Sequence, residues 1–227
     1  MSRPGELAPV VRESTVSHVA RVLRTAIMYG ELAPGAQLGE AALAEALGVS
    51  RGPLREAMQR LVQEGIVRSE PNRGLFVIDF TDDDVRDVYA ARAAIERAAA
   101  AAILRGDPRA AADRLEDALR QMHDAAESDD VVALTDADLA FHESLVRLAR
   151  SPRLQRMHDT LLVETRMCMA AANDTYTRPV DALKEHLGIV EALRSGDAGA
   201  VEHAIDAHMA DALARLGSSP TAPAPPS

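Results

Sequence analysis

Two short amphipathic helices joined by a tight glycine turn are the feature that most restricts the fold of this chain. Gly48 ends the first predicted helix, Glu40–Leu47, and Ser50 is a typical N-cap for the second, which runs from Arg51 to about Glu64. The second helix places apolar residues at i, i+4 and i+7, namely Leu54, Met58 and Leu61. This spacing gives one buried stripe, so the segment predicts a helix–turn–helix.

Predicted elements on both sides extend this motif. Apolar residues recur at helical spacing over residues 16–27, which predicts a further helix before it. After the motif, the strand-like segments Ile66–Arg68 and Leu75–Ile78 flank a turn at Glu70–Gly74, which indicates a short hairpin. A helix–turn–helix followed by a hairpin is a winged helix-turn-helix.

From Thr81 to residue 217 the pattern is helical throughout. Thr81 is a typical N-cap, and the three aspartates after it favour the positive end of a helix dipole. Predicted breaks fall at Gly106–Pro108, Ser128–Asp130, Ser151–Pro152, Asn173–Pro179 and Ser195–Asp197. They divide the segment into about six helices, enough for an antiparallel bundle. The chain is therefore predicted to be mainly α, with an N-terminal winged helix-turn-helix, a small β-hairpin and a C-terminal all-helical antiparallel bundle.

The charge distribution changes near residue 80. Residues 1–80 carry 9 basic and 9 acidic residues, whereas residues 81–227 carry 16 basic and 26 acidic residues and account for the whole net charge of −10. A neutral segment can still bind DNA when its arginines gather on one face. We expect four regions, namely a flexible arm (1–13), a winged helix-turn-helix domain (14–80), a helical domain (81–217) and a disordered proline-rich tail (218–227).

Cys168 is the only cysteine, which excludes an intrachain disulfide and the four-cysteine zinc motifs. It lies in an apolar helical context and is interpreted as a buried structural thiol. No apolar run reaches transmembrane length, and no apolar signal core follows the N-terminus. The sequence therefore predicts a cytoplasmic protein without a membrane partner.

Candidate DNA-binding residues lie at two places. Ser50, Arg51, Gly52 and Arg55 lie at the start of the second helix of the motif, the part that points at base edges when such a helix enters the major groove. Arg51 can make a forked contact to guanine, and the free backbone N–H groups of this helix end can bind a phosphate. Arg73–Gly74 forms the tip of the hairpin, from which the arginine can reach the minor groove or the backbone.

Residues 16–78 resemble the winged helix of the GntR family of regulators. The matching stretches are Gly30–Gly35, Leu43–Arg51, Leu54–Ala57, Leu61–Gly65 and Arg73–Gly74. The resemblance implies a homodimer that binds a short palindromic operator in double-stranded DNA. It places operator-contacting positions at Ser50, Arg51, Arg55 and Arg73–Gly74.

This segment departs from the family pattern at two places. Gly52 stands where family members often carry a hydroxyl that can bond a phosphate or a base. Ala41 and Ala42 stand where the fatty-acid-responsive type carries a basic contact residue. We therefore expect an operator preference that differs from that type.

Four side chains of the helical segment are candidates for a metal site. Asp138 and His142 are four residues apart and project from one face of a predicted helix, and His186 and His208 lie in two later helices. One carboxylate and three imidazoles would bind a divalent metal and leave coordination positions open. On spacing alone, ordinary surface or core histidines remain the better explanation.

Residues 82–216 resemble the FCD ligand-binding domain of the FadR branch of the GntR family. The matching pieces are Asp138–His142, Glu185–His186, Ile189, Ala192–Leu193, Gly196–Asp197 and His208. The resemblance implies that Asp138, His142, His186 and His208 bind a divalent ion (Zn, Ni, Mn or Fe) that helps to hold a small carboxylate effector. The remaining histidines, His123, His158 and His203, do not match ligand positions and are interpreted as surface or core residues.

Two arginines are candidates for binding the effector. Arg92 matches an arginine that faces the ligand pocket in the family, and it could pair with an effector carboxylate through both nitrogens. An ion pair with Glu96, four residues further on, is an equally good interpretation. Arg166 is a second candidate because it lies in an apolar helical stretch.

The combination of a DNA reader and a metal constellation predicts a ligand-responsive transcription regulator, a repressor or an activator, and not an enzyme. A DNA-binding protein whose helical domain only dimerises is one alternative. A metal-dependent hydrolase is the other, since an open metal site can activate water. The hydrolase is disfavoured because no general base accompanies the ligands and an enzyme has no use for a winged helix.

Overall fold

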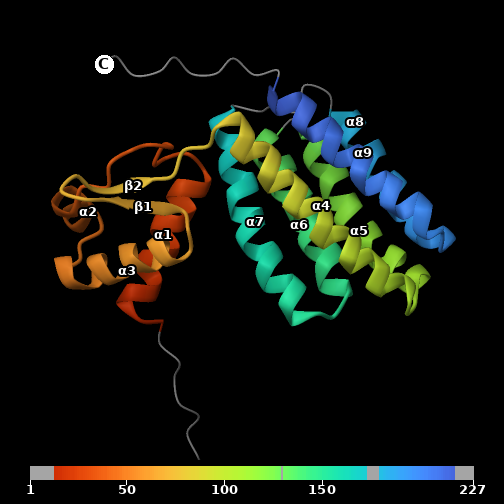
Figure 1. Ribbon diagram of the computed structural model, residues 1–227, viewed down its shortest axis with the longest axis horizontal. Helices are drawn as coiled ribbons and strands as arrows, with labels where there is room; N and C mark the ends of the chain where they lie inside the picture. Colours follow the sequence, from red (N-terminus) through yellow and green to blue (C-terminus); the bar gives the residue numbers. More distant parts are fainter. Residues whose placement is uncertain (1–12, 129, 173–178, 218–227) are drawn as a thin grey trace, which may run out of the picture.

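Three helices form the N-terminal part of the computed structural model, which describes residues 13–128, 130–172 and 179–217 (Figure 1). They are α1 (Thr15–Met28), α2 (Glu40–Ala46) and α3 (Arg51–Gln63). Ser14 begins α1, because its hydroxyl accepts the backbone N–H of Ser17 at 3.1 Å. The predicted arm, except Glu13, and the predicted tail lie outside the described residues.

The predicted stripe of α3 is the centre of the N-terminal core. Leu54, Met58 and Leu61 are fully buried and pack with the apolar face of α1. Ser50 is the N-cap residue of α3, as predicted, but its side chain makes no capping hydrogen bond in the structure. Its hydroxyl is therefore not occupied by its own helix.

A short antiparallel hairpin follows, formed by β1 (Val67–Glu70) and β2 (Gly74–Val77). The predicted turn at Glu70–Gly74 was too wide, since these two residues pair with each other and only residues 71–73 turn the chain. Asn72 makes this tight turn with a φ of 62°, a conformation that asparagine tolerates. The segment before α2 extends the sheet, because the N–H of Leu38 donates to the carbonyl of Leu75 at 2.8 Å.

The rest of the described chain is a helical bundle, and the predicted number of about six helices is confirmed within it. The helices are α4 (Asp82–Leu104), α5 (Pro108–Glu127), α6 (Val131–Leu148), α7 (Pro152–Ala171), α8 (Pro179–Ser195) and α9 (Ala198–Gly217). Thr81 and Asp84 form a complete capping box at the start of α4. Asp107, Asp130 and Ser151 cap the next three helices. The predicted break at Asn173–Pro179 falls largely outside the described residues.

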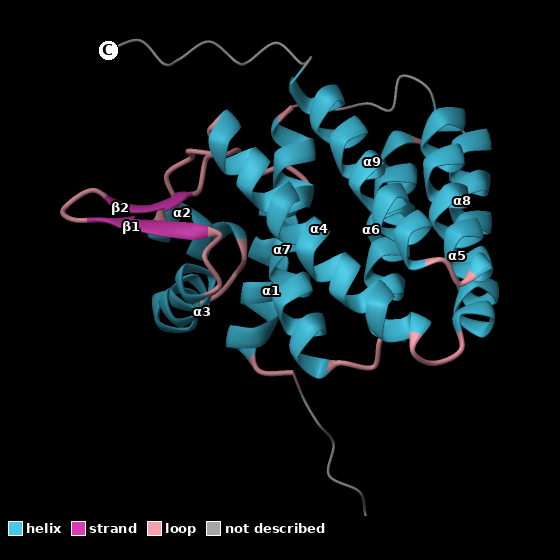
Figure 2. Cartoon of the chain, turned by 45° about the vertical axis from the view of Figure 1, so that its right-hand side comes forward, coloured by secondary structure: helices cyan, strands magenta, loops and turns pink. Residues whose placement is uncertain are grey.

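The bundle has its own apolar core, in which α5 packs against α6 and α8 while α4 packs against α7 and α9. Helix α7 lies on the side that faces α1, as Figures 1 and 2 show. Met167 of α7 is buried in the N-terminal core, so the two cores meet at this helix. Cys168, next to it, is buried as predicted. Among the helices described, none combines the length and the apolar character that crossing a membrane would need.

Candidate metal centre and DNA-binding face

The structure brings the four predicted metal ligands together inside the bundle. Asp138 and His142 come from α6, His186 from α8 and His208 from α9, and all four are buried. Their potential ligand atoms all lie within 4.8 Å of one another. The Nε2 atom of His142 lies 3.2 Å from that of His186 and 3.0 Å from that of His208. An Oδ1 atom of Asp138 lies 3.0 Å from Nε2 of His186.

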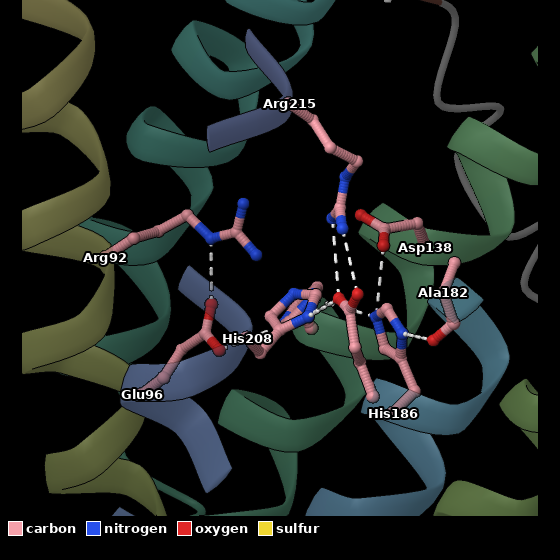
Figure 3. A network of polar contacts seen from close by, with 9 residues as sticks. Arg92, Glu96, Asp138, Ala182, His186, His208 and Arg215 are labelled. Atoms are coloured by element: carbon pink, nitrogen blue, oxygen red, sulfur yellow. Dashed lines mark hydrogen bonds and ion pairs between the residues drawn. The ribbon is translucent and has the colours of Figure 1, made fainter. Parts of the chain in front are cut away.

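Hydrogen bonds on the outer side of the three imidazoles set which nitrogen faces the centre. Nδ1 of His142 donates to Glu96 at 2.8 Å, and Nδ1 of His208 donates to Glu185 at 3.0 Å. Nδ1 of His186 donates to the carbonyl of Ala182 at 2.7 Å (Figure 3). A carboxylate or a carbonyl only accepts, so each neutral ring holds its proton at Nδ1 and turns the Nε2 lone pair inward. Three converging lone pairs and one carboxylate fit a divalent cation.

The electrostatics of the cluster also suit a cation. Burial lowers the pKa of His142 to about 3, although the charge of Glu96 opposes this shift. Burial lowers the pKa of His208 as well, with a further contribution from His186. Burial works against the ionised form of Asp138, but the contact with His186 outweighs it and lowers the pKa of the carboxyl. Neutral His142 and His208 beside an ionised Asp138 match the protonation state that metal binding requires.

Arg92 makes the ion pair with Glu96 that the sequence offered as one of two interpretations. Its Nε donates to Oε1 of Glu96 at 2.9 Å, and both side chains are fully buried. Its Nη2 is buried and has no hydrogen-bond partner among the residues that the structure describes. In Figure 3 the guanidinium extends beyond Glu96 on the side of the imidazoles. The ion pair therefore uses only part of the guanidinium, and the effector contact stays a prediction.

Three acidic or basic side chains around the cluster were not foreseen as part of it. Glu96 connects Arg92, His142 and His158, whose Nε2 lies 3.1 Å from Oε1 of Glu96. Glu185 bonds His208 and is itself paired with Arg215 at 2.9 Å. Glu185 stands beside His186 in the sequence, but nothing in the spacing of Glu96 or Arg215 indicates these contacts.

Arg166 lies at the boundary between the bundle and the N-terminal part. Its side chain is 7% exposed, and its Nη2 lies 3.3 Å from Asp136. Its guanidinium carbon lies 4.3 Å from the ring centroid of Tyr29, which follows α1. These contacts account for its burial, and the predicted effector role of Arg166 stays untested.

The predicted DNA-binding residues are exposed at two places in the N-terminal part. Ser50, Arg51, Gly52 and Arg55 lie at the start of α3, where Arg55 also pairs with Glu40 at 2.7 Å. At the hairpin, Arg73 is 69% exposed, and its guanidinium carbon lies 5.3 Å from the ring centroid of Phe76. Gly74 has a φ of 107°, which favours glycine. The two arginine-bearing edges are therefore solvent-exposed, although Arg55 pairs with Glu40 and Arg73 with Glu70.

Comparisons with known families match both parts of the chain. Residues 15–77 match the family described as bacterial regulatory proteins, gntR family. Residues 87–211, more than half of the chain, match the FCD domain. The first match ends with β2 and the second begins within α4, so the gap between them contains the connection from the winged helix to the bundle.

Relatives that align over most of their length are transcription regulators. A probable D-xylose utilization operon transcriptional repressor of Paenarthrobacter nicotinovorans is 29% identical over 201 residues, 88% of each chain. The transcriptional repressor RspR of Escherichia coli is 29% identical and aligns with 84% of each chain. A solved structure of a putative GntR regulator from Rhodococcus sp. RHA1 superposes with a TM-score of 0.77 and 30% identity, covering 91% of this chain and 99% of that one. This chain therefore belongs to the GntR family of transcription regulators, with an N-terminal GntR helix-turn-helix domain and a C-terminal FCD domain.

Proposed function

We propose that this chain is a homodimeric, ligand-responsive regulator whose FCD domain binds a divalent metal and, through it, a small organic acid. The observation that carries the proposal is the orientation of the three imidazoles. Each Nδ1 is engaged by an acceptor, so His142, His186 and His208 all turn Nε2 toward Asp138. Histidines that only fill a core would not be expected to point three Nε2 atoms at one place.

The chain's own residues would hold the metal and orient the effector. Asp138, His142, His186 and His208 would be the ligands, and a bound ion would supply a Lewis-acidic centre for a carboxylate. Arg92 supports an organic acid as the effector, because its buried Nη2 has no partner in the described part of the chain and can donate to an oxygen beside the cluster. Glu96 holds Arg92 and His142 in one network, so it fixes both with respect to each other.

Ser50, Arg51 and Arg55 at the start of α3 would contact the operator bases. Arg73–Gly74 of the hairpin would contact the adjacent DNA backbone or minor groove. Two such heads in a homodimer would read the two halves of a palindrome. A change in the distance between them, caused by the effector, would change operator affinity.

Metal content tests the FCD half of the proposal. We expect the protein purified without chelator to contain one divalent ion per chain by elemental analysis, and His142→Ala with His186→Ala to abolish it. His203→Ala is a matched control, since His203 is exposed on the same helix as His208. Undiminished metal in the double variant would overturn the assignment of the four ligands.

DNA binding and effector binding are tested separately. A mobility-shift assay on DNA selected from a random-sequence library should show selective binding that weakens as salt rises. Calorimetric titration with a panel of small organic acids, on metal-loaded and chelator-treated protein, should show metal-dependent heat for at least one acid. Heat from none of them would favour the alternative in which the bundle only dimerises.

A further inference from the structure

Three side chains, from the C-cap of α1 and from helices α6 and α7, meet at the boundary between the FCD domain and the helix-turn-helix domain. The hydroxyl of Tyr29, directly after α1, donates to Oδ2 of Asp136 on α6 at 2.8 Å. Nη2 of Arg166 on α7 lies 3.3 Å from Oδ1 of the same carboxylate. The guanidinium of Arg166 also lies over the ring of Tyr29, 4.3 Å from its centroid. Each of the three therefore contacts the other two.

The ion pair between Arg166 and Asp136 is not an ordinary surface ion pair. The Arg166 side chain is 7% exposed and the Asp136 side chain is 44% exposed, so a nearly buried cation is paired with a partly solvated anion. A charge removed from water to this extent requires a partner. Nε of Arg166 is buried and has no hydrogen bond to any described residue, so the pairing with Asp136 and the ring of Tyr29 compensate the burial of the guanidinium.

Both bundle helices in this contact also carry a residue of the metal network. Asp136 precedes the candidate ligand Asp138 by two residues on α6, so the two carboxylates point to different sides of the helix. On α7, the fully buried His158 contacts Glu96, which in turn bonds the candidate ligand His142. A movement of α6 or α7 at the metal centre would therefore displace Asp136 or Arg166 at the domain boundary.

On the other side, the contact is continuous with the DNA-reading helix. Met167, next to Arg166, is buried in the core of the helix-turn-helix domain. Helix α1, whose C-cap residue is Tyr29, packs along α3, and α3 carries Arg51 and Arg55 at its exposed end. The position of Tyr29 is thus tied to the position of the recognition helix.

We propose that Tyr29, Asp136 and Arg166 form an interdomain latch that positions the helix-turn-helix domain on the FCD domain, and that occupation of the metal centre acts on DNA binding through this latch. The second half of this inference rests on the proposed metal function. In this role the three are positioning residues, and none of them needs to touch metal, effector or DNA.

A double-mutant cycle on the full, metal-free chain tests the latch itself. Tyr29→Phe removes the hydroxyl and keeps the ring, and Asp136→Asn removes the charge. Glu143→Gln is a control on the same helix, because Glu143 pairs with Arg147 and not with Tyr29 or Arg166 among the described residues. Hydrogen–deuterium exchange of residues 15–28 should accelerate about tenfold in each latch variant, since a hydrogen bond to a charged group is lost. The double variant should exchange no faster than either single one, and Glu143→Gln should match the unaltered chain.

The same variants loaded with Zn²⁺ test the regulatory half. In the unaltered chain and in Glu143→Gln, we expect zinc to slow exchange in residues 131–148 and also in residues 15–28. In Tyr29→Phe and Asp136→Asn, it should slow exchange in residues 131–148 only. Equal slowing of residues 15–28 in all four proteins would overturn the regulatory half, because the signal would bypass the latch.

The outcomes separate the latch from the metal proposal. A chain that retains no zinc by elemental analysis overturns the metal proposal, and this result is obtained before any exchange is measured. Additive effects of Tyr29→Phe and Asp136→Asn in the metal-free chain overturn the latch, whatever the metal content.

Discussion

Nδ1 of His142 lies 2.8 Å from Oε2 of Glu96, and both side chains are fully shielded from solvent. Burial works against the charge of Glu96, but His142 and Arg92 outweigh it and hold the pKa of this carboxyl well below its usual range. An ionised Glu96 then fixes the tautomer of His142. This pair joins α4 to α6, and Glu96 also contacts His158 on α7.

Replacing Glu96 with Gln should weaken metal binding and destabilise the fold. The amide cannot accept from Arg92, His142 and His158 as a carboxylate does, so we expect metal affinity to fall about 10- to 100-fold. Leaving buried Arg92 without its anion should cost about 3 kcal/mol of unfolding free energy. Competition with a metal-binding dye and urea denaturation measure the two effects. Glu127→Gln, which alters an exposed carboxylate beside His123, should change neither.

Removing the metal should lower the thermal stability of the protein. An ion that binds only the folded chain stabilises it by about 4 kcal/mol when its free concentration is 1,000 times the Kd. We therefore expect a chelator to lower the midpoint of thermal unfolding by several degrees, and added Zn²⁺ to restore it. A midpoint that does not respond to chelator or to Zn²⁺ would contradict a metal bound at the four ligands. His203→Ala should respond like the unaltered chain.

Gly52 has room for a side chain that carries a hydroxyl. A Cβ added at Gly52 would meet no atom within 4 Å. Gly52→Ser should therefore fold normally and could bond a phosphate, which we expect to raise DNA affinity about tenfold. The measurement is a mobility shift on selected DNA at fixed salt. Gly188→Ser, an equally open position in α8, is the control and should leave DNA affinity unchanged, so an equal gain in both variants would rule out a local contact.

Leu54 is the centre of the N-terminal core, with no exposed surface. Leu54→Ala removes buried methyl groups and leaves a cavity, so we expect a loss of about 2–5 kcal/mol of unfolding free energy. Leu187→Ala, at a position 43% exposed, should change it by less than about 0.5 kcal/mol. Urea denaturation followed by circular dichroism compares the two variants. Similar losses would mean that burial at Leu54 is not what stabilises α3.

Cys168 should be inert in the native protein. Burial raises the pKa of its thiol to about 12, with help from the charge of Glu164. At pH 8 only about one thiol in ten thousand would be the reactive thiolate. We expect Ellman's reagent to label Cys168 only after guanidinium unfolds the chain, when one thiol per chain should react. Rapid labelling of the native protein would show that this part of α7 opens to solvent.

Local patterns in the sequence were sufficient for most of the secondary structure. The stripe of Leu54, Met58 and Leu61 and the N-cap at Thr81 depend only on residues a few positions apart, and the structure has both. The hairpin turn was less well predicted. The width of the turn depends on where strand pairing stops, and here it continues to the pair of Glu70 and Gly74. Single-residue preferences do not determine this point.

The sequence by itself determined a winged helix-turn-helix followed by a helical bundle, and it identified four candidate ligands on three predicted helices. Only the tertiary structure decided what surrounds them. Glu96 is 46 residues from His142 and 62 from His158, so their contacts arise from helix packing and not from spacing. Tyr29 and Asp136 are 107 residues apart, and they meet because α7 joins the two cores. Periodicity reports which face of a helix is buried, but it carries no information about which other helix that face will meet.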